Sequence, residues 1–270
     1  MPPPEGCRRV RTGLLRRLAD ILPPTLRDPL RRAYRSFAPA PAEPMMYRAH
    51  LFEELLGAAG RDGFRGKRIL EIGPRDGLDS KRLAALEPSL LVLIDLPEKR
   101  EVTKPWLAAL PCPNRYIEAN FMYMPQAEID ALGRFDLIWC TGVLYHNAEQ
   151  LRFLRKLYKL LAVGGWLVLE SSTLRGPSLI RKGAYVQIHY PRTYRDTGTV
   201  THLPTAAAVK AWLSMAGFSE IRDSRCFEKD NPDLIGLRMA WLVHKADDDG
   251  GGLYYAKSGL NPAYQLGDST

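Results

Sequence analysis

The feature that most constrains the fold is a regular alternation of apolar runs and amphipathic stretches that begins at Lys67. Strand-like runs occupy 67–73, 90–96, 115–119, 134–140 and 166–171, and helical patterns lie between them at 78–87, 98–110, 126–132 and 148–162. This alternation is typical of a parallel sheet with helices on both faces. A helix at 204–216 and strands at 218–227 and 236–245 follow, and the turn at Asn231-Pro232 makes these two strands antiparallel. We therefore predict an α/β fold whose seven-stranded, mostly parallel sheet ends in an antiparallel hairpin.

The flanking segments have different compositions and suggest the domain organisation. Residues 1–44 are predicted to form a basic amphipathic helical arm with a proline-rich linker, and residues 45–246 the main domain. Residues 172–203 show little helical or alternating pattern, and an excursion of that length is usually a lid or an acceptor-binding loop. Residues 247–270 open with Asp-Asp-Asp-Gly-Gly-Gly and are predicted to be a flexible tail.

Charge and cysteine content restrict the class of protein. Of the net charge of +8, the excess is densest in residues 1–50, which hold ten arginines and four acidic residues. Such an arm fits an anionic membrane surface, a partner, or packing on its own domain. Because the positive charge is concentrated in the arm and not on the fold, nucleic acid is the less favoured partner. No run of about 20 apolar residues is present, so we expect no membrane-spanning helix. Four widely separated cysteines argue against a zinc site or a disulfide framework, so we expect no metal and a cytoplasmic protein, peripheral to the membrane if the arm binds there.

A glycine-containing turn predicts the ligand. The first strand runs into Glu71-Ile-Gly73-Pro-Arg-Asp76-Gly77, and Asp95 ends the next strand. A strand, a glycine turn, a helix and an acid about twenty residues later describe a nucleoside site, in which the acid accepts the ribose hydroxyls. The G-x-G-x-x-G spacing of a dinucleotide site is absent, and carboxylates beside the turn disfavour a pyrophosphate. They suit a ligand with cationic groups, such as the ammonium and sulfonium of S-adenosylmethionine.

With these features the chain resembles class I S-adenosylmethionine-dependent methyltransferases over roughly residues 45–246. The matching pieces are EIGPRDG, LIDLP, FDLIWCTGVLYH and LLAVGGWLVLES. GVLYH and THLPTAAAVKAWLSMAGF resemble the branch that contains the tRNA wobble-uridine carboxymethyltransferase. The resemblance implies a Rossmann-like methyltransferase sheet and S-adenosyl-L-methionine as cofactor. The long N-terminal region of the tRNA enzyme corresponds here only to the arginine-rich arm.

The resemblance also implies which residues bind the cofactor. Asp95 would hold the ribose diol, and Leu96 would lie against the adenine. The adenine edge and face would meet Asn120, Phe121 and Met122, although the last two are also typical core residues. The methionine portion would be surrounded by Glu71, Gly73, Pro74, Arg75, Gly77, Cys140, Thr141 and Gly142. A cysteine such as Cys140 is more often a small buried filler than a reactive thiol.

The acceptor side is predicted from residues that follow the fourth and fifth strands. His146 is the candidate catalytic base, with Tyr145 beside it, and the alternative role of His146 is to cap a helix. The excursion supplies a polar and aromatic set suited to a sugar or aromatic acceptor, namely His189, Tyr190, Tyr194, Arg195 and His202. The leading functional prediction is O-methylation of a small-molecule or glycan hydroxyl. The alternatives are a tRNA- or RNA-modifying methyl- or carboxymethyltransferase, and a cofactor-binding module without catalysis.

Overall fold

The computed structural model describes residues 46–174, 182–191 and 199–248. All of them belong to one compact unit, Met46–Thr270, and the predicted arm lies outside the described residues. None of the helices within these ranges is long and apolar enough to cross a membrane.

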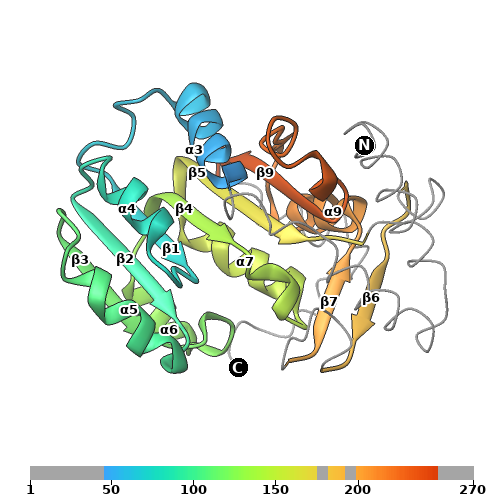
Figure 1. The fold of residues 1–270 in the computed structure, drawn as a ribbon, viewed down its shortest axis with the longest axis horizontal. Helices are drawn as coiled ribbons and strands as arrows, with labels where there is room; N and C mark the ends of the chain where they lie inside the picture. The colour runs from blue at the N-terminus through green and yellow to red at the C-terminus, as the bar shows by residue number, and fades with distance from the viewer. Residues whose placement is uncertain (1–45, 175–181, 192–198, 249–270) are drawn as a thin grey trace, which may run out of the picture. The chain divides into compact units, whose positions relative to one another are not determined.

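The centre of this unit is a seven-stranded sheet in the order β3-β2-β1-β4-β5-β9-β8 (Figure 1). Strands β1 to β5 are parallel, whereas β9 pairs antiparallel with both β5 and β8. The strands are β1 Arg68–Ile72, β2 Leu90–Asp95, β3 Asn114–Glu118, β4 Phe135–Thr141, β5 Leu161–Ser172, β8 Glu220–Asp223 and β9 Arg238–His244. The predicted fold class is confirmed.

The connections between strands are helices at the expected places. The α-helices are α3 Met46–Ala59, α4 Leu78–Ala84, α5 Arg100–Leu107, α6 Gln126–Ala131, α7 Gln150–Leu160 and α9 Ala206–Ala216. Short 3-10 turns are η1 Pro97–Lys99, η2 Phe121–Tyr123, η3 Leu144–His146 and η4 Pro232–Leu234. Helix α5 begins later than expected because η1 precedes it, and β5 begins at Leu161, five residues before the predicted run of 166–171.

The excursion after β5 departs from the prediction. Its described part contains two strands, β6 Val186–His189 and β7 Thr201–Pro204, which form a separate antiparallel sheet. The expectation of little regular structure in 172–203 is therefore wrong for these residues. Strand β6 (Val-Gln-Ile-His) alternates apolar and polar residues, but four residues are too few to distinguish a strand from a loop, and nearly all of them are exposed. We call this pair the β6–β7 sheet.

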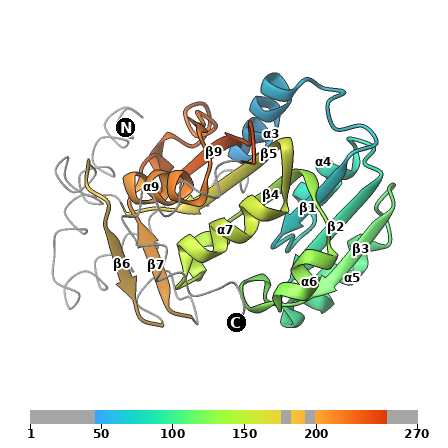
Figure 2. The ribbon, with the colours of Figure 1, turned by 180° about the vertical axis from the view of Figure 1, so that it is seen from behind.

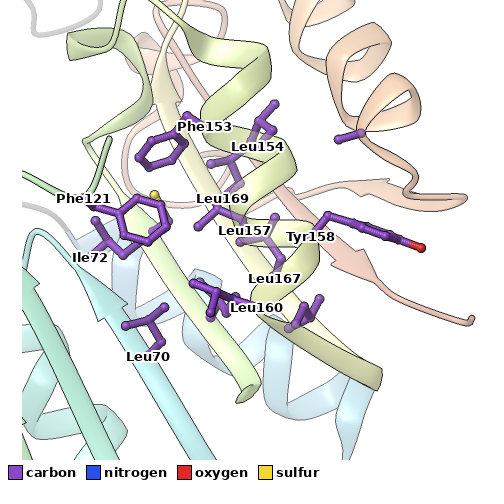
Figure 3. Packing of buried hydrophobic residues seen from close by; sticks show 14 of the residues in the cluster. Leu70, Ile72, Phe121, Phe153, Leu154, Leu157, Tyr158, Leu160, Leu167 and Leu169 are labelled. Atoms are coloured by element: carbon purple, nitrogen blue, oxygen red, sulfur yellow. The ribbon is translucent and has the colours of Figure 1, made fainter. Parts of the chain in front are cut away.

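The core lies on both faces of the large sheet. Helices α6, α7 and α9 cover one face, which Figure 2 presents to the viewer. Phe153, Leu154 and Leu157 of α7 are fully buried there against strand residues such as Leu70 and Leu167 (Figure 3). On the other face α3 contacts β4 through Phe52 and Trp139, whose ring centroids are 6.1 Å apart. With both faces covered, ligand-binding residues are left to the carboxyl edge of the strands.

Candidate cofactor and acceptor site

The glycine turn between β1 and α4 has a backbone that requires glycine. Gly73 and Gly77 have φ angles of 75° and 72°. A Cβ at Gly77 would lie 2.2 Å from Cδ2 of Trp106, whose Nε1 donates to the Arg75 carbonyl at 3.2 Å. A Cβ at Gly73 would lie 2.7 Å from Val143. At both glycines the close neighbour is a protein side chain, which gives each of them a packing role. Pro74 is buried in the same turn.

Asp95 joins this turn to the end of β2. Its Oδ1 accepts from the Leu96 amide at 2.8 Å, and its Oδ2 accepts from the Arg75 amide at 3.2 Å. The side chain is largely buried, and burial raises its pKa, while the two backbone donors act in the opposite direction. The carboxylate is thereby fixed at the carboxyl edge, and its further lone pairs are suited to the two hydroxyls of a ribose. Leu96 is half-buried beside it.

Glu71 is the buried acid at the end of β1. Ser80 of α4 donates to its Oε2 at 2.5 Å. Burial, followed by the charge of Asp79, raises the pKa of Glu71 to about 8. A carboxyl group in this state favours a nearby cation, because a positive ligand group would stabilise its ionised form.

Asp79 holds a charged network on the same side. Its Oδ2 accepts from Arg48 at 3.0 Å and from Trp139 Nε1 at 3.2 Å, and its Oδ1 accepts from Arg82 at 2.8 Å. The Thr141 hydroxyl lies 3.4 Å from the same carboxylate. Arg48 comes from α3, so the helix that precedes the sheet contributes a guanidinium to this edge of the domain.

A second buried ion pair lies across the turn after β4. Arg238 of β9 donates to Glu170 of β5 through Nε at 2.5 Å and Nη2 at 2.8 Å. The guanidinium of Arg238 also lies over the Tyr145 ring, 5.7 Å from its centroid. A Cβ at Gly142 would lie 3.3 Å from Nη2 of Arg48 and 3.6 Å from Nη2 of Arg238. Two fixed cations therefore converge on Gly142.

The remaining predicted cofactor residues differ in exposure. Cys140 is fully buried within β4, and burial raises its thiol pKa. Asn120 caps η2 by accepting from the Met122 amide at 3.1 Å. Phe121 and Met122 are buried, and Phe121 packs edge-on against Phe153 at 5.2 Å (Figure 3). The structure thus gives Phe121 and Met122 the core contacts that were the alternative interpretation, while their predicted contact with adenine stays a prediction.

The loop after β4 carries the candidate acceptor residues. The rings of Tyr145 and His146 are 4.1 Å apart, and Thr199 Oγ1 lies 3.5 Å from Nδ1 of His146. The His146 side chain is partly open to solvent, yet the surrounding protein, Arg238 and Lys99 lower its pKa. At neutral pH the imidazole is therefore neutral and able to accept a proton.

The β6–β7 sheet is adjacent to this loop, as the Thr199 contact indicates. It carries His189 and His202, and Tyr190 follows it with 72% of its side chain exposed. Tyr194 and Arg195 lie outside the described residues. The structure thus brings three of the five predicted acceptor residues to the same region as His146.

Sequence reasoning missed several charged or polar residues of the site. Glu170 ends a buried apolar run, as Asp95 does, so the signal that identified Asp95 applies to Glu170 as well. Arg238 likewise interrupts an apolar strand. For Arg48 and Asp79 the sequence offers no comparable signal, because both lie on helices where charged residues are common.

The residues present fit S-adenosylmethionine. Fixed acceptor oxygens at Asp95 suit a ribose, and the acidic group of Glu71 suits the cationic methionine end. The guanidinium of Arg48 beside Gly142 suits the carboxylate of the same ligand.

Comparison with known proteins agrees with this geometry. Residues 45–222 match the methyltransferase domain family. A tRNA U34 carboxymethyltransferase of Desulforapulum autotrophicum is 29% identical over 163 residues, which are 57% of this chain and 45% of that protein. The enzyme of the same name from Alcanivorax borkumensis is 30% identical over 184 residues, which are 66% of this chain and 52% of that protein. The chain thus spans about half the length of these curated relatives.

Solved structures share the fold. The N-terminal domain of EvdMO1, crystallised with SAH and D-fucose, superposes with a TM-score of 0.56 at 20% identity, covering 77% of this chain and 85% of that chain. An S-adenosylmethionine-dependent methyltransferase from Mesorhizobium loti gives a TM-score of 0.52 at 16% identity, covering 73% and 96%. Together with the glycine turn, Asp95 and the family match, these findings show that the chain belongs to the methyltransferase domain family and is a class I S-adenosylmethionine-dependent methyltransferase.

Proposed function

We propose that this methyltransferase modifies RNA, with transfer RNA as the acceptor, and that it transfers a methyl or carboxymethyl group. The observation that carries the proposal is the surface beside His146, where Tyr190 follows β6 and is 72% exposed. Exposed aromatic rings are platforms on which bases of single-stranded RNA stack. The names of the curated relatives support the same acceptor class.

The position of Arg238 supports a carboxylated donor. Its guanidinium is fixed by Glu170, lies beside Gly142 and faces the Tyr145 ring. A carboxylate on the transferred carbon would meet this cation, whereas a plain methyl group gains nothing from it. We therefore expect the carboxylated form of S-adenosylmethionine to bind at least as tightly as the plain form.

The chain's own residues act mainly by alignment. The cofactor supplies an activated carbon on a sulfonium that leaves readily. Asp95 would hold its ribose, Glu71 its cationic end, and the η3 loop would face the incoming nucleophile. Alignment of this kind accounts for about 7–11 kcal/mol of barrier lowering in well-oriented systems.

The proposal is tested with the full-length protein. Bulk tRNA lacking modifications is incubated with labelled S-adenosylmethionine or its carboxylated form, digested to nucleosides and analysed by mass spectrometry, with a panel of sugars and phenols in parallel. Label in a tRNA nucleoside supports the proposal, and label only in sugars or phenols overturns it. Asp95→Asn provides the cofactor-deficient control.

The stacking surface has its own matched control. Tyr190→Ala should weaken tRNA binding by roughly tenfold, since base stacking on an aromatic side chain contributes about 1–3 kcal/mol. Tyr123→Ala removes a tyrosine of equal exposure, 72%, from η2. Equal loss of tRNA binding in both variants would remove the β6–β7 sheet from the RNA site.

A second candidate, O-methylation of a small-molecule or sugar hydroxyl, is favoured by the lowered pKa of His146. A neutral imidazole can accept the hydroxyl proton, which is worth about 10²–10⁴-fold in rate. His146→Ala should then lower kcat by at least about 10²-fold with cofactor affinity nearly unchanged. Normal turnover with a lower melting temperature would instead assign His146 to bracing the loop.

A further inference from the structure

Helix α7 begins with a buried polar residue that no step of the proposed reaction uses. Gln150 is only 3% exposed. Its Nε2 donates to the Leu144 carbonyl of η3 at 3.2 Å and to the His202 carbonyl of β7 at 2.9 Å. One side-chain amide thus uses both of its hydrogens, each on a different segment.

The two segments have different tasks in the site. Leu144 directly precedes Tyr145 and His146, in the loop that follows β4 beside Gly142. His202 belongs to the β6–β7 sheet, on the acceptor side, and pairs with Ile188. These two carbonyls are separated by 58 residues of sequence, including a segment outside the described ranges.

We propose that Gln150 is a positioning residue that fixes the spacing between the η3 loop and the β6–β7 sheet, and so aligns the acceptor with the transferred carbon. Transfer from a sulfonium depends on an in-line approach, and a displacement of about 1 Å can cost about 10²-fold in rate. A buried amide is suited to this role because each of its hydrogen bonds is shielded from water and its rotamer is restricted by the core around it.

The same helix supplies a matched control. Lys156, also buried, donates to the carbonyls of Met122 at 2.7 Å and Met124 at 3.1 Å, on the segment that follows β3. Gln150 and Lys156 therefore make equivalent contacts from one helix to opposite sides of the site. Removing either polar group disturbs α7 to a comparable extent, but each should loosen a different segment.

The first measurement is hydrogen exchange with mass spectrometry on the full-length protein, which does not depend on the acceptor. Gln150→Met keeps the length of the side chain and removes both hydrogen bonds. We expect exchange in 143–148 and 200–204 to accelerate by about two- to tenfold, since each segment loses one hydrogen bond, while S-adenosylhomocysteine affinity stays within about twofold. Lys156→Met should instead accelerate exchange in 120–125 and weaken S-adenosylhomocysteine binding.

A second variant separates positioning from simple space filling. Gln150→Glu has the same shape, and its buried carboxyl should have a raised pKa, so its protonated form still donates one hydrogen bond. After correction for intrinsic exchange rates, hydrogen exchange of this variant in 143–148 and 200–204 should be closer to that of the wild type at pH 5.5 than at pH 8. Gln150→Met should show no such recovery at low pH. If Gln150 only fills space, neither variant changes the two segments selectively and no recovery occurs, which overturns the proposal.

The kinetic measurement rests on the proposed tRNA acceptor. With tRNA, Gln150→Met should lower kcat by about tenfold or more at unchanged cofactor affinity. A fall in cofactor affinity equal to the fall in kcat would overturn the positioning role. If tRNA is not an acceptor, the wild type shows no turnover with it, and the exchange measurements still decide the role of Gln150.

Discussion

At the scale of single residues, Asp95 is the group on which cofactor binding most depends. Asp95→Asn keeps the shape but removes the charge that would hold two ribose hydroxyls, and a hydrogen bond to a charged group is worth about 1.5–3 kcal/mol. We expect S-adenosylhomocysteine affinity, measured by calorimetry, to fall about ten- to a hundredfold. Asp136→Asn is the matched control, because Asp136 also accepts from a backbone amide, that of Arg68 at 2.9 Å, near the start of β4. Equal affinity in the Asp95 variant and the wild type would contradict the assignment.

The raised pKa of Glu71 gives cofactor binding a pH dependence. Below its pKa of about 8 the group is largely protonated and neutral, so a cationic ligand must displace that proton. Affinity for S-adenosylhomocysteine should therefore rise from pH 6 to pH 7.5, by up to about tenfold per pH unit. Glu71→Gln should remove the dependence, and adenosine, which lacks the ammonium, should not show it. If the affinity of the wild type does not change with pH, Glu71 does not interact with the ammonium of the ligand.

How far single residues could be predicted depended on whether their surroundings in sequence made them unusual. An acid that ends an apolar strand is costly to bury without a partner, so Asp95 was identifiable, and Glu170 had the same signal. Arg48 was not identifiable, since its partner Asp79 lies on another helix and only the folded chain brings them together. Gln150 was hidden for the same reason.

At the scale of elements, the glycine turn between β1 and α4 is the most constrained connection. Gly77→Ala would place a Cβ against the Trp106 ring and hold a non-glycine residue at a φ of 72°. We expect a loss of about 2–4 kcal/mol of folding stability in chemical denaturation, combining backbone strain with overpacking. Gly60→Ala is the control, because its φ is 86° but nothing lies within 4 Å of the added Cβ, so only the strain remains. Similar losses of folding stability in the two variants would show that the Trp106 side chain moves aside without cost.

Elements were predictable where burial on both faces of the sheet produced a continuous apolar run. Strands β1, β2 and β4 are fully covered and were predicted within a residue or two of their observed ends. The β6–β7 sheet was missed because each of its strands is only four residues long, which is too short for a period to stand out, and β6 is exposed at nearly every position.

At the scale of the whole molecule, local pattern fixes the class of fold but not the order of its strands. The alternation from Lys67 indicated a parallel sheet, and the turn predicted at Asn231-Pro232 indicated an antiparallel pair at its end. The insertion of β9 between β5 and β8 had no local signal, because it is decided by which edge of the finished sheet is free. It matters for the site, since it brings Arg238 next to Glu170.

Charge is also a property of the whole chain, and its uneven distribution leads to the final prediction. Residues 1–45 hold nine arginines and four acidic residues, and every residue assigned above to the cofactor lies within residues 46–248. A truncated chain of residues 46–270 should therefore bind S-adenosylhomocysteine within about twofold of the full-length protein. If the arginines contact phosphates, tRNA affinity of the full-length protein should fall more steeply with salt than that of the truncated chain, because each contact releases counterions. Filter binding from 50 to 300 mM salt measures both slopes. Equal slopes, with full-length protein alone pelleting on anionic vesicles, would assign the arm to a membrane surface instead.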